Sequence, residues 1–188
     1  MDSEYCEESE FAGKPIVPFE NVEKSYPPDM FLFALPMGMR KLNKIREEKY
    51  LAAKAKGYTF ITWISNESNC YAESIGENTF IFPHTLIQPY TKIGNNCILW
   101  PCTGVGHNCI IGENCYLASP KISGCVQLKH NCFLGTNTTI GDTLSIGEYS
   151  VIGAGAIVTR DIPAGSVLAV KQTSTMPVAS WDMEDILG

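Results

Sequence analysis

The sequence has no uninterrupted apolar run of the roughly 20 residues that a membrane-spanning helix needs, and positive charge is scarce. Fourteen Lys and Arg residues stand against 20 Asp and Glu residues, which gives a formal net charge of −6. Because polyanions are bound mainly by basic surfaces, we do not expect a nucleic-acid-binding protein. The first ten residues carry five acidic side chains, the reverse of the basic start of a signal peptide. These features favour a soluble, cytoplasmic protein that binds neither membranes nor nucleic acid.

Three kinds of motif are also missing. There is no Cys-x-x-Cys pair, and the eight cysteines are spread too evenly along the chain for a zinc cluster. We therefore expect reduced, structural thiols and no metal site. There is no GxGxxG segment and no Walker loop, so a complete nucleotide-binding unit is not visible.

What the sequence does contain is a six-residue repeat that begins at residue 75. Aliphatic residues recur at every sixth position in two series, and the single step between the series, from Leu117 to Ile122, is five residues long. The first series is Ile75, Ile81, Ile87, Ile93, Leu99, Val105, Ile111 and Leu117, and the second is Ile122, Leu128, Leu134, Ile140, Ile146, Ile152 and Val158. A period of six fits neither an amphipathic helix nor a half-buried strand.

Two further positions follow the same period. Glycine often comes one residue after the aliphatic, and a small side chain, usually Thr or Cys, comes four residues after it. This pattern predicts a three-sided solenoid in which six residues form one side and one corner. The aliphatic and the small residue point inward, and glycine supplies the positive φ or the close approach of a tight corner. The fifteen units predict an all-β solenoid of about five coils, slightly distorted at the five-residue step beside Lys121. Periodicity leaves the handedness open, although the general rule for parallel crossovers favours the right hand.

The segments on either side of the repeat differ from it. Residues 31–35 and 58–64 are predicted as strands, and residues 39–56 as a helix that Gly57 ends. This small βαβ unit should pack on the first coil. Residues 159–170 predict one more strand, and Trp181–Gly188 predict either a short capping helix or a disordered tail. The expected division is an N-terminal α/β subdomain at 1–70, the solenoid at 71–170 and a tail at 171–188.

Three segments resemble a known family. The sequences GHNCIIGENC (106–115), NCFLGTNTTIGD (131–142) and IGAGAIVTRDIPAGSVLAV (152–170) resemble the left-handed β-helix, or hexapeptide-repeat, acyltransferases. The closest resemblance, over residues 28–170, is to the sugar O- and N-acetyltransferases, typified by sialic acid O-acetyltransferase and the acetyltransferases of UDP-4-amino sugars. It implies a left-handed parallel β-helix, a homotrimer, and acetyl-CoA bound as cosubstrate between neighbouring coils. It also implies a sugar or amino-sugar acceptor and a place in polysaccharide biosynthesis.

The resemblance assigns roles to individual residues. His107 takes the place of the family's general base, and a neutral imidazole suits that role near neutral pH. Asn108 stands beside it where the family often has Asp or Glu, and Tyr116 stands where a second histidine is often found. The cofactor side comprises the remaining assigned residues. They are Tyr116, Gly124, Gly135, Gly153, Ala154, Gly155 and Arg160, the last as a partner for CoA phosphates.

Several alternatives remain open at this stage. A non-catalytic scaffold and an acyltransferase that acts on a non-sugar amine both fit the repeat. A zinc site is disfavoured because His84, His107 and His130 are predicted to fall on three different corners. Phe82 and Trp100 replace corner glycines, which predicts exposed aromatic rings at a subunit interface or, less favoured, a sugar-stacking platform.

Overall fold

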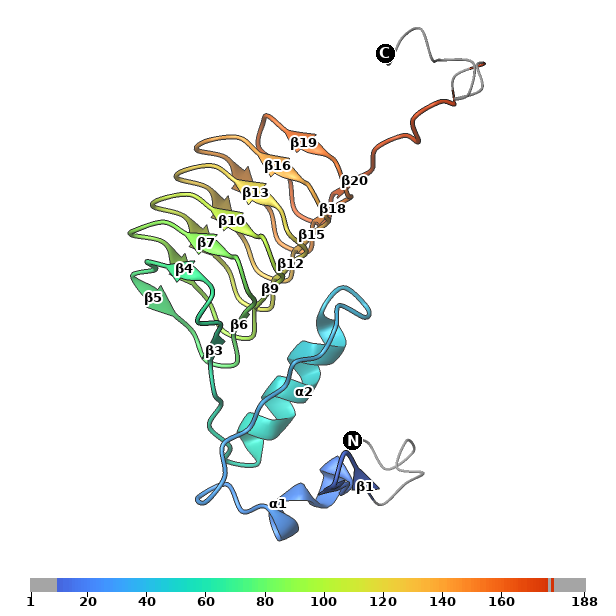
Figure 1. Cartoon of the computed structure of the whole chain (residues 1–188). Coiled ribbons are helices and arrows are strands. Elements are labelled where there is room, and N and C mark those ends of the chain that lie inside the picture. Colours follow the sequence, from blue (N-terminus) through green and yellow to red (C-terminus); the bar gives the residue numbers. More distant parts are fainter. Residues whose placement is uncertain (1–9, 176, 178–188) are drawn as a thin grey trace, which may run out of the picture.

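The computed structural model describes residues 10–175 and 177 of the 188. A small N-terminal unit precedes a long solenoid (Figure 1). The unit contains a two-stranded antiparallel ribbon, a 3₁₀ turn and two helices. These elements are β1 (Glu10–Phe11), β2 (Lys14–Pro15), η2 (Phe19–Asn21), α1 (Val22–Ser25) and α2 (Lys44–Ala55).

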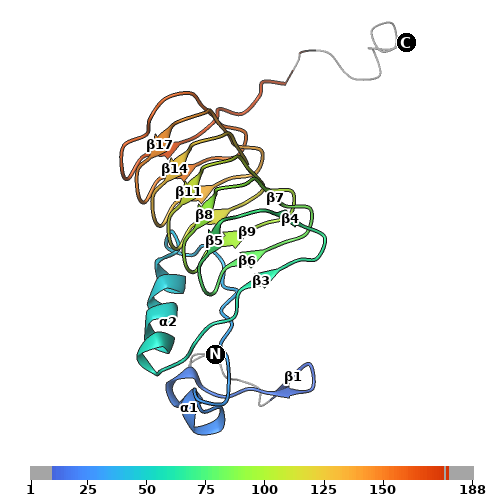
Figure 2. The ribbon, with the colours of Figure 1, turned by 90° about the vertical axis from the view of Figure 1, so that its left-hand side faces the viewer.

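The solenoid is a three-sided parallel β-helix of about six turns, built from two-residue strands. Its first turn spans residues 63–75 and ends at Ile75, where the predicted repeat begins. The solenoid is therefore about one turn longer than the repeat predicts. We call its sides face A, face B and face C, in the order in which the chain crosses them (Figures 1 and 2). Face A contains β3 (Trp63–Ile64), β6 (Phe80–Ile81), β9 (Ile98–Leu99), β12 (Tyr116–Leu117), β15 (Phe133–Leu134), β18 (Val151–Ile152) and β20 (Val167–Leu168). Face B contains β4 (Asn69–Cys70), β7 (Leu86–Ile87), β10 (Gly104–Val105), β13 (Lys121–Ile122), β16 (Thr139–Ile140) and β19 (Ile157–Val158). Face C contains β5 (Ser74–Ile75), β8 (Lys92–Ile93), β11 (Ile110–Ile111), β14 (Gln127–Leu128) and β17 (Ser145–Ile146).

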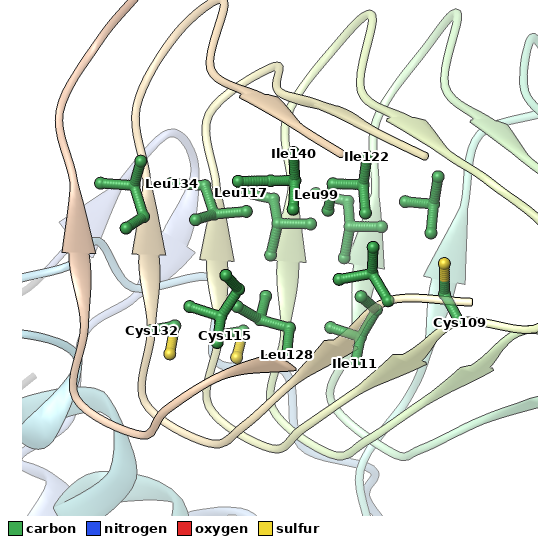
Figure 3. Packing of buried hydrophobic residues seen from close by; sticks show 14 of the residues in the cluster. Leu99, Cys109, Ile111, Cys115, Leu117, Ile122, Leu128, Cys132, Leu134 and Ile140 are labelled. Atoms are coloured by element: carbon green, nitrogen blue, oxygen red, sulfur yellow. The ribbon is translucent and has the colours of Figure 1, made fainter. Parts of the chain in front are cut away.

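The core is the column predicted by the repeat. Aliphatic side chains from all three faces meet on the axis (Figure 3). The small residues also point inward and are buried, and their hydroxyl and thiol groups bond to corner carbonyls. Thr91 Oγ1 donates to Gly106 O at 2.7 Å, and Cys115 Sγ donates to Lys129 O at 3.2 Å. The seven cysteines that the structure describes are free thiols, and four of them lie in this column. These buried cysteines therefore act as hydrogen-bond donors as well as small apolar groups.

The sequence analysis gave the corner glycines two possible roles, a positive φ or a close approach, and in the structure different corner positions fill these two roles. Positive φ occurs three residues after the aliphatic, where Asn is the commonest residue, as at Asn96 and Asn114. The glycine directly after the aliphatic instead allows close approach of the next coil. A Cβ on Gly112 would lie 2.6 Å from His130 N. Asn tolerates the left-handed conformation better than other non-glycine residues, which explains its frequency.

The five-residue step does not disturb the strand ladders. Tyr116–Leu117 and Lys121–Ile122 keep full register with the coils on either side. One residue is missing between Leu117 and the corner, so Ser119 takes the positive φ and the buried Pro120 takes the small inward position. The distortion expected here is confined to a single corner.

The N-terminal unit contains the expected βαβ connection in a minimal form. Phe33 and Phe60 form an isolated parallel bridge, with α2 between them. The strand predicted at 58–64 is divided, because Trp63–Ile64 already belong to the first turn of the solenoid. The helix starts at Lys44 rather than at residue 39, since residues 41–43 all have positive φ.

The sequence predicted that the N-terminal unit packs on the first coil, but the unit contacts several coils. Helix α2 lies along the corner between faces C and A, beside several turns (Figures 1 and 2). Four asparagines stack at this corner, joined by side-chain hydrogen bonds of 2.7–3.3 Å. They are Asn78, Asn96, Asn114 and Asn131. Glu47 of α2 accepts hydrogen bonds from the last two, and the buried Arg46 donates to Asn96 O and Asn114 O.

The C-terminal part is described as far as residue 175, with residue 177 beyond it. The strand predicted after residue 159 is present as β20, which pairs with β18. The prediction for Trp181–Gly188 lies outside the described residues. Within the described ranges, no helix is long and apolar enough to span a membrane.

Candidate active site

The residues predicted to do chemistry gather at the corner between faces B and C. A hollow of ≈ 350 Å³ opens there over four successive turns. Its lining includes Leu86, Gln88, His107, Lys121, Gly124 and Asp142. His107 and Asn108 follow β10 at this corner and are both exposed. The imidazole Nδ1 lies 3.0 Å from Asn108 Oδ1. Nε2 has no hydrogen-bond partner among the described residues, and it faces Gly124.

Gly124 lies one turn further along, directly against the imidazole. A Cβ at this position would lie 2.7 Å from His107 Nε2, so only glycine leaves room for the ring. Both backbone groups of Gly124 have partners. Its N–H donates to Asp142 Oδ1 at 2.9 Å, and its carbonyl accepts from Thr143 N at 2.9 Å. The glycine predicted to contact the cofactor is thus also the residue that gives the imidazole its space.

Two residues that the sequence did not single out hold this corner. Gln88, one turn before His107, accepts a hydrogen bond from the His107 backbone N–H at 3.1 Å. Asp142, two turns after His107, holds the Gly124 N–H. The sequence signal that could have identified them is their spacing from His107. Residues about 18 positions apart stack at one corner, and Gly124 and Asp142 share the corner of His107. Neither residue type marks a site unless the stacking is known.

A second histidine has the same local geometry but a different environment. His130 Nδ1 lies 3.1 Å from Asn131 Oδ1 at the corner between faces C and A. Its ring packs edge-on against Tyr149 at 5.2 Å, and Lys44 of α2 lies over the same tyrosine. Histidine followed by asparagine therefore does not define the site. The hollow and Gly124 distinguish His107.

The remaining predicted cofactor residues lie elsewhere on the prism. Gly135 and Gly153–Gly155 stack on adjacent turns at the corner between faces A and B, where a Cβ on Gly135 would lie 2.5 Å from Ala154 N. Tyr116 is on face A, beneath Arg46 at 5.9 Å and between the rings of Trp100 and Phe133. Burial raises the pKa of the Tyr116 hydroxyl. A single chain thus does not bring these residues to His107.

Arg160 occupies the same corner as His107 but on the last turn. Three turns separate the two residues, about 14 Å at the usual strand spacing. Arg160 lines a separate hollow at the end of the solenoid and is exposed. The three histidines lie at three different corners, and no cluster of metal-ligating side chains occurs among the described residues.

Replacing Gly124 with alanine tests the close contact with the imidazole. The new Cβ would lie within 2.9 Å of two His107 ring atoms, so the ring must rotate out of its position. We expect a reaction that uses His107 as its base to slow at least tenfold. The melting temperature should change little, because the φ of Gly124 is not positive. Gly38→Ala is the control, since a Cβ there would meet nothing within 4 Å and Gly38 lies outside the hollow. Equal activities of the two variants would contradict the assignment.

Known proteins share both sequence and fold with this chain. The model of the family described as "GMPPB C-terminal domain" matches residues 81–183, more than half of the chain. The bifunctional protein GlmU of Halalkalibacterium halodurans is 28% identical over 123 residues, which are 63% of this chain and 23% of the relative. An acyl-[acyl-carrier-protein]–UDP-N-acetylglucosamine O-acyltransferase of Nautilia profundicola is 36% identical over 97 residues, 47% of this chain and 38% of the relative. The chain thus spans less than half the length of these curated relatives.

Solved structures of sugar acetyltransferases share the fold. The acetyltransferase domain of PglB from Neisseria gonorrhoeae superposes with a TM-score of 0.77 at 21% identity, covering 85% of this chain and 78% of that domain. It has also been solved with acetyl coenzyme A. PerB from Caulobacter crescentus, solved with CoA and GDP-perosamine, has a TM-score of 0.64 at 18% identity over 85% of this chain and 77% of its own.

These likenesses confirm the predicted fold class, a left-handed parallel β-helix with a small N-terminal α/β unit. The family match covers the solenoid from Ile81 in β6 onward and includes every residue that lines the hollow at His107. The chain therefore belongs to the family defined by the GMPPB C-terminal domain.

Proposed function

We propose that the chain is an acetyl-CoA-dependent acyltransferase that acetylates a hydroxyl or amine of a sugar or sugar derivative. The observation that carries this proposal is the His107 imidazole, held through Nδ1 at the edge of a hollow with Nε2 free to meet a substrate. Of the structures that share the fold, one is a complex with acetyl coenzyme A and another is a complex with CoA and GDP-perosamine, which supports the cosubstrate and the acceptor class.

The chemistry follows from the tautomer that Asn108 selects. An amide oxygen accepts a hydrogen bond, so Nδ1 carries the proton and Nε2 keeps its lone pair. Nε2 takes the proton of the acceptor hydroxyl or amine as that group attacks the thioester carbon. The C–S bond then breaks, and the proton passes from Nε2 to the departing thiolate of CoA. Transfer is direct, with no acyl-enzyme.

Stabilisation of the developing oxyanion requires a backbone donor. The candidate donor is the N–H of Gly124, which lies beside the imidazole and is bonded to Asp142. It becomes available to the thioester oxygen only when the exposed Asp142 carboxylate turns away. Asp142 is thus a positioning residue of the proposed site.

The distribution of residues supports a homotrimer in which the site lies between copies. His107 lies at one corner, and Gly135 and Gly153–Gly155 lie at another, across face B. In a cyclic trimer, two different surfaces meet at each interface, so the glycine corner of one copy can line the cofactor arm beside the histidine corner of the next. Trp100 is 45% exposed on face A near this corner and stacks on Phe82. Its exposure supports a subunit interface there.

Calorimetric titration with acetyl-CoA tests the proposed function. We expect micromolar binding at about one site per chain, little changed in His107→Ala, because the base contacts the acceptor more than the cofactor. Radiolabelled acetyl-CoA is then offered with amino sugars, sialic acids and nucleotide sugars. No binding at millimolar acetyl-CoA would remove the transferase and leave a non-catalytic solenoid. Transfer to a non-sugar amine alone would change the acceptor class.

A further inference from the structure

The corner that carries His107 is chemically different on its two sides. On the side of the later turns lie Gly124, Asp142 and finally Arg160, which are small, polar or charged. On the side of the earlier turns lie Leu86, Pro89, Tyr90 and Tyr71, which are apolar or aromatic and exposed. The solenoid repeat requires only buried aliphatic and small side chains, so it does not explain aromatic rings at this outer position.

The strand register fixes where these residues lie. Leu86–Ile87 pair with Gly104–Val105, so Gln88 lies beneath Gly106 and Pro89 beneath His107. Asn108 N donates to Pro89 O at 3.1 Å, which places the two corners in direct contact. Asn69–Cys70 pair with Leu86–Ile87, so Tyr71 lies one turn further down, beneath Gln88.

Tyr90 has a conformation that the corner does not favour for a bulky residue. Its φ is +64°, at a position that Asn108 fills on the next turn of the same corner and that Asn78 and Asn96 fill at the corner between faces C and A. Bulky side chains rarely adopt this conformation. Tyr149 also has a positive φ, but its ring packs against His130 and beneath Lys44. Tyr90 is 67% exposed, and among the described residues its ring has no aromatic neighbour and its hydroxyl has no hydrogen-bond partner.

We propose that Tyr90, with Pro89 and Tyr71 beside it, forms the acceptor subsite and stacks on the apolar face of a pyranose ring. Tyrosine offers a rigid aromatic surface with a polar tip, which suits a ring whose C–H groups and hydroxyls lie on different sides. The subsite lies on the turn before the base, beside the hollow rather than in its lining, and His107 Nε2 faces the next turn at Gly124. A stacked sugar therefore reaches Nε2 with a hydroxyl or amine that extends past the edge of the imidazole. CoA then occupies the opposite side, toward Arg160. This inference rests on the proposed function.

Kinetics of Tyr90→Ala and Tyr90→Phe in the full chain test the subsite. We expect Tyr90→Ala to raise the KM for the sugar acceptor about five- to tenfold, with kcat and the Kd for acetyl-CoA little changed. Tyr90→Phe, which keeps the ring, should behave as the wild type. Sedimentation is measured on both variants. A KM unchanged in Tyr90→Ala would overturn the proposal, and so would a change in oligomeric size, which would assign the ring to a subunit interface.

A binding measurement separates this inference from the failure of catalysis. Saturation-transfer NMR is recorded with D-glucosamine, N-acetyl-D-glucosamine and N-acetylneuraminic acid, with no acetyl-CoA present. Transfer to the ring protons of at least one sugar, lost in Tyr90→Ala and kept in Tyr90→Phe, supports the subsite even where no acetyl transfer is found. Absence of transfer in the wild type, or equal transfer in all three proteins, overturns it.

Discussion

Replacing His107 with alanine is expected to lower kcat/KM for acetyl transfer by about 10²- to 10⁴-fold, the usual contribution of a positioned general base. The acceptor hydroxyl or amine then has no group to take its proton as it attacks the thioester. The fold should be unaffected, because the imidazole is exposed and no core residue depends on it. Steady-state kinetics with the acceptor found in the substrate screen provide the measurement.

The chain contains a matched control for this experiment. His130 has the same Asn neighbour at nearly the same distance, 3.1 Å against 3.0 Å, but lies at another corner. His130→Ala should keep full activity while losing some stability through the Tyr149 contact. Full activity of His107→Ala would rule out the proposed mechanism. Equal losses in both variants would indicate a general effect on folding rather than on proton transfer.

Replacing Arg46 with methionine is expected to be the most destabilising single change in the N-terminal unit, at about 3 kcal/mol or more of unfolding free energy. The guanidinium is fully buried and makes six hydrogen bonds, five of them to backbone carbonyls. Burial lowers its pKa, yet it still bonds carbonyls of both the solenoid and the segment before α2. Methionine fills the space but leaves these carbonyls without their donor.

Thermal unfolding followed by circular dichroism measures the effect. For a chain of this size, a loss of that order lowers the melting temperature by about 10 °C. Arg46→Lys should be nearly as damaging, because one ammonium group does not replace a planar fork of five donors. Arg40→Ala, which changes an exposed arginine six residues away, should leave the melting temperature unchanged. A stable Arg46→Met protein would show that α2 docks by other contacts.

The prediction of the solenoid succeeded because its physical cause is local. Each six-residue unit must bury one aliphatic and one small side chain, so the positions of Ile81, Thr85 and their equivalents are visible in the sequence itself. The same six-residue register predicted that the three histidines occupy different corners. The role of His107, in contrast, was predicted from the family motif. The five-residue step was visible too, although its accommodation by Ser119 and Pro120 was not.

Other features depend on which residues stack between turns. Gln88 and Asp142 become part of the site only because the coil places them one turn before and two turns after His107. The asparagine column at the corner between faces C and A also bonds across turns, and this explains why α2 lies along several coils rather than on the first. Such contacts join residues about 18 positions apart, and no local propensity records them.

The sequence by itself thus determined the repeat and the inward-facing residues, because these follow from burial within each unit, whereas the candidate base came from the family resemblance. Only the tertiary structure decided how the turns stack, where α2 packs, and that Tyr116, Gly135 and Gly153–Gly155 lie away from His107. The physical reason is that corners and faces are set by the closure of the whole coil, in which residues of separate turns come together through backbone pairing.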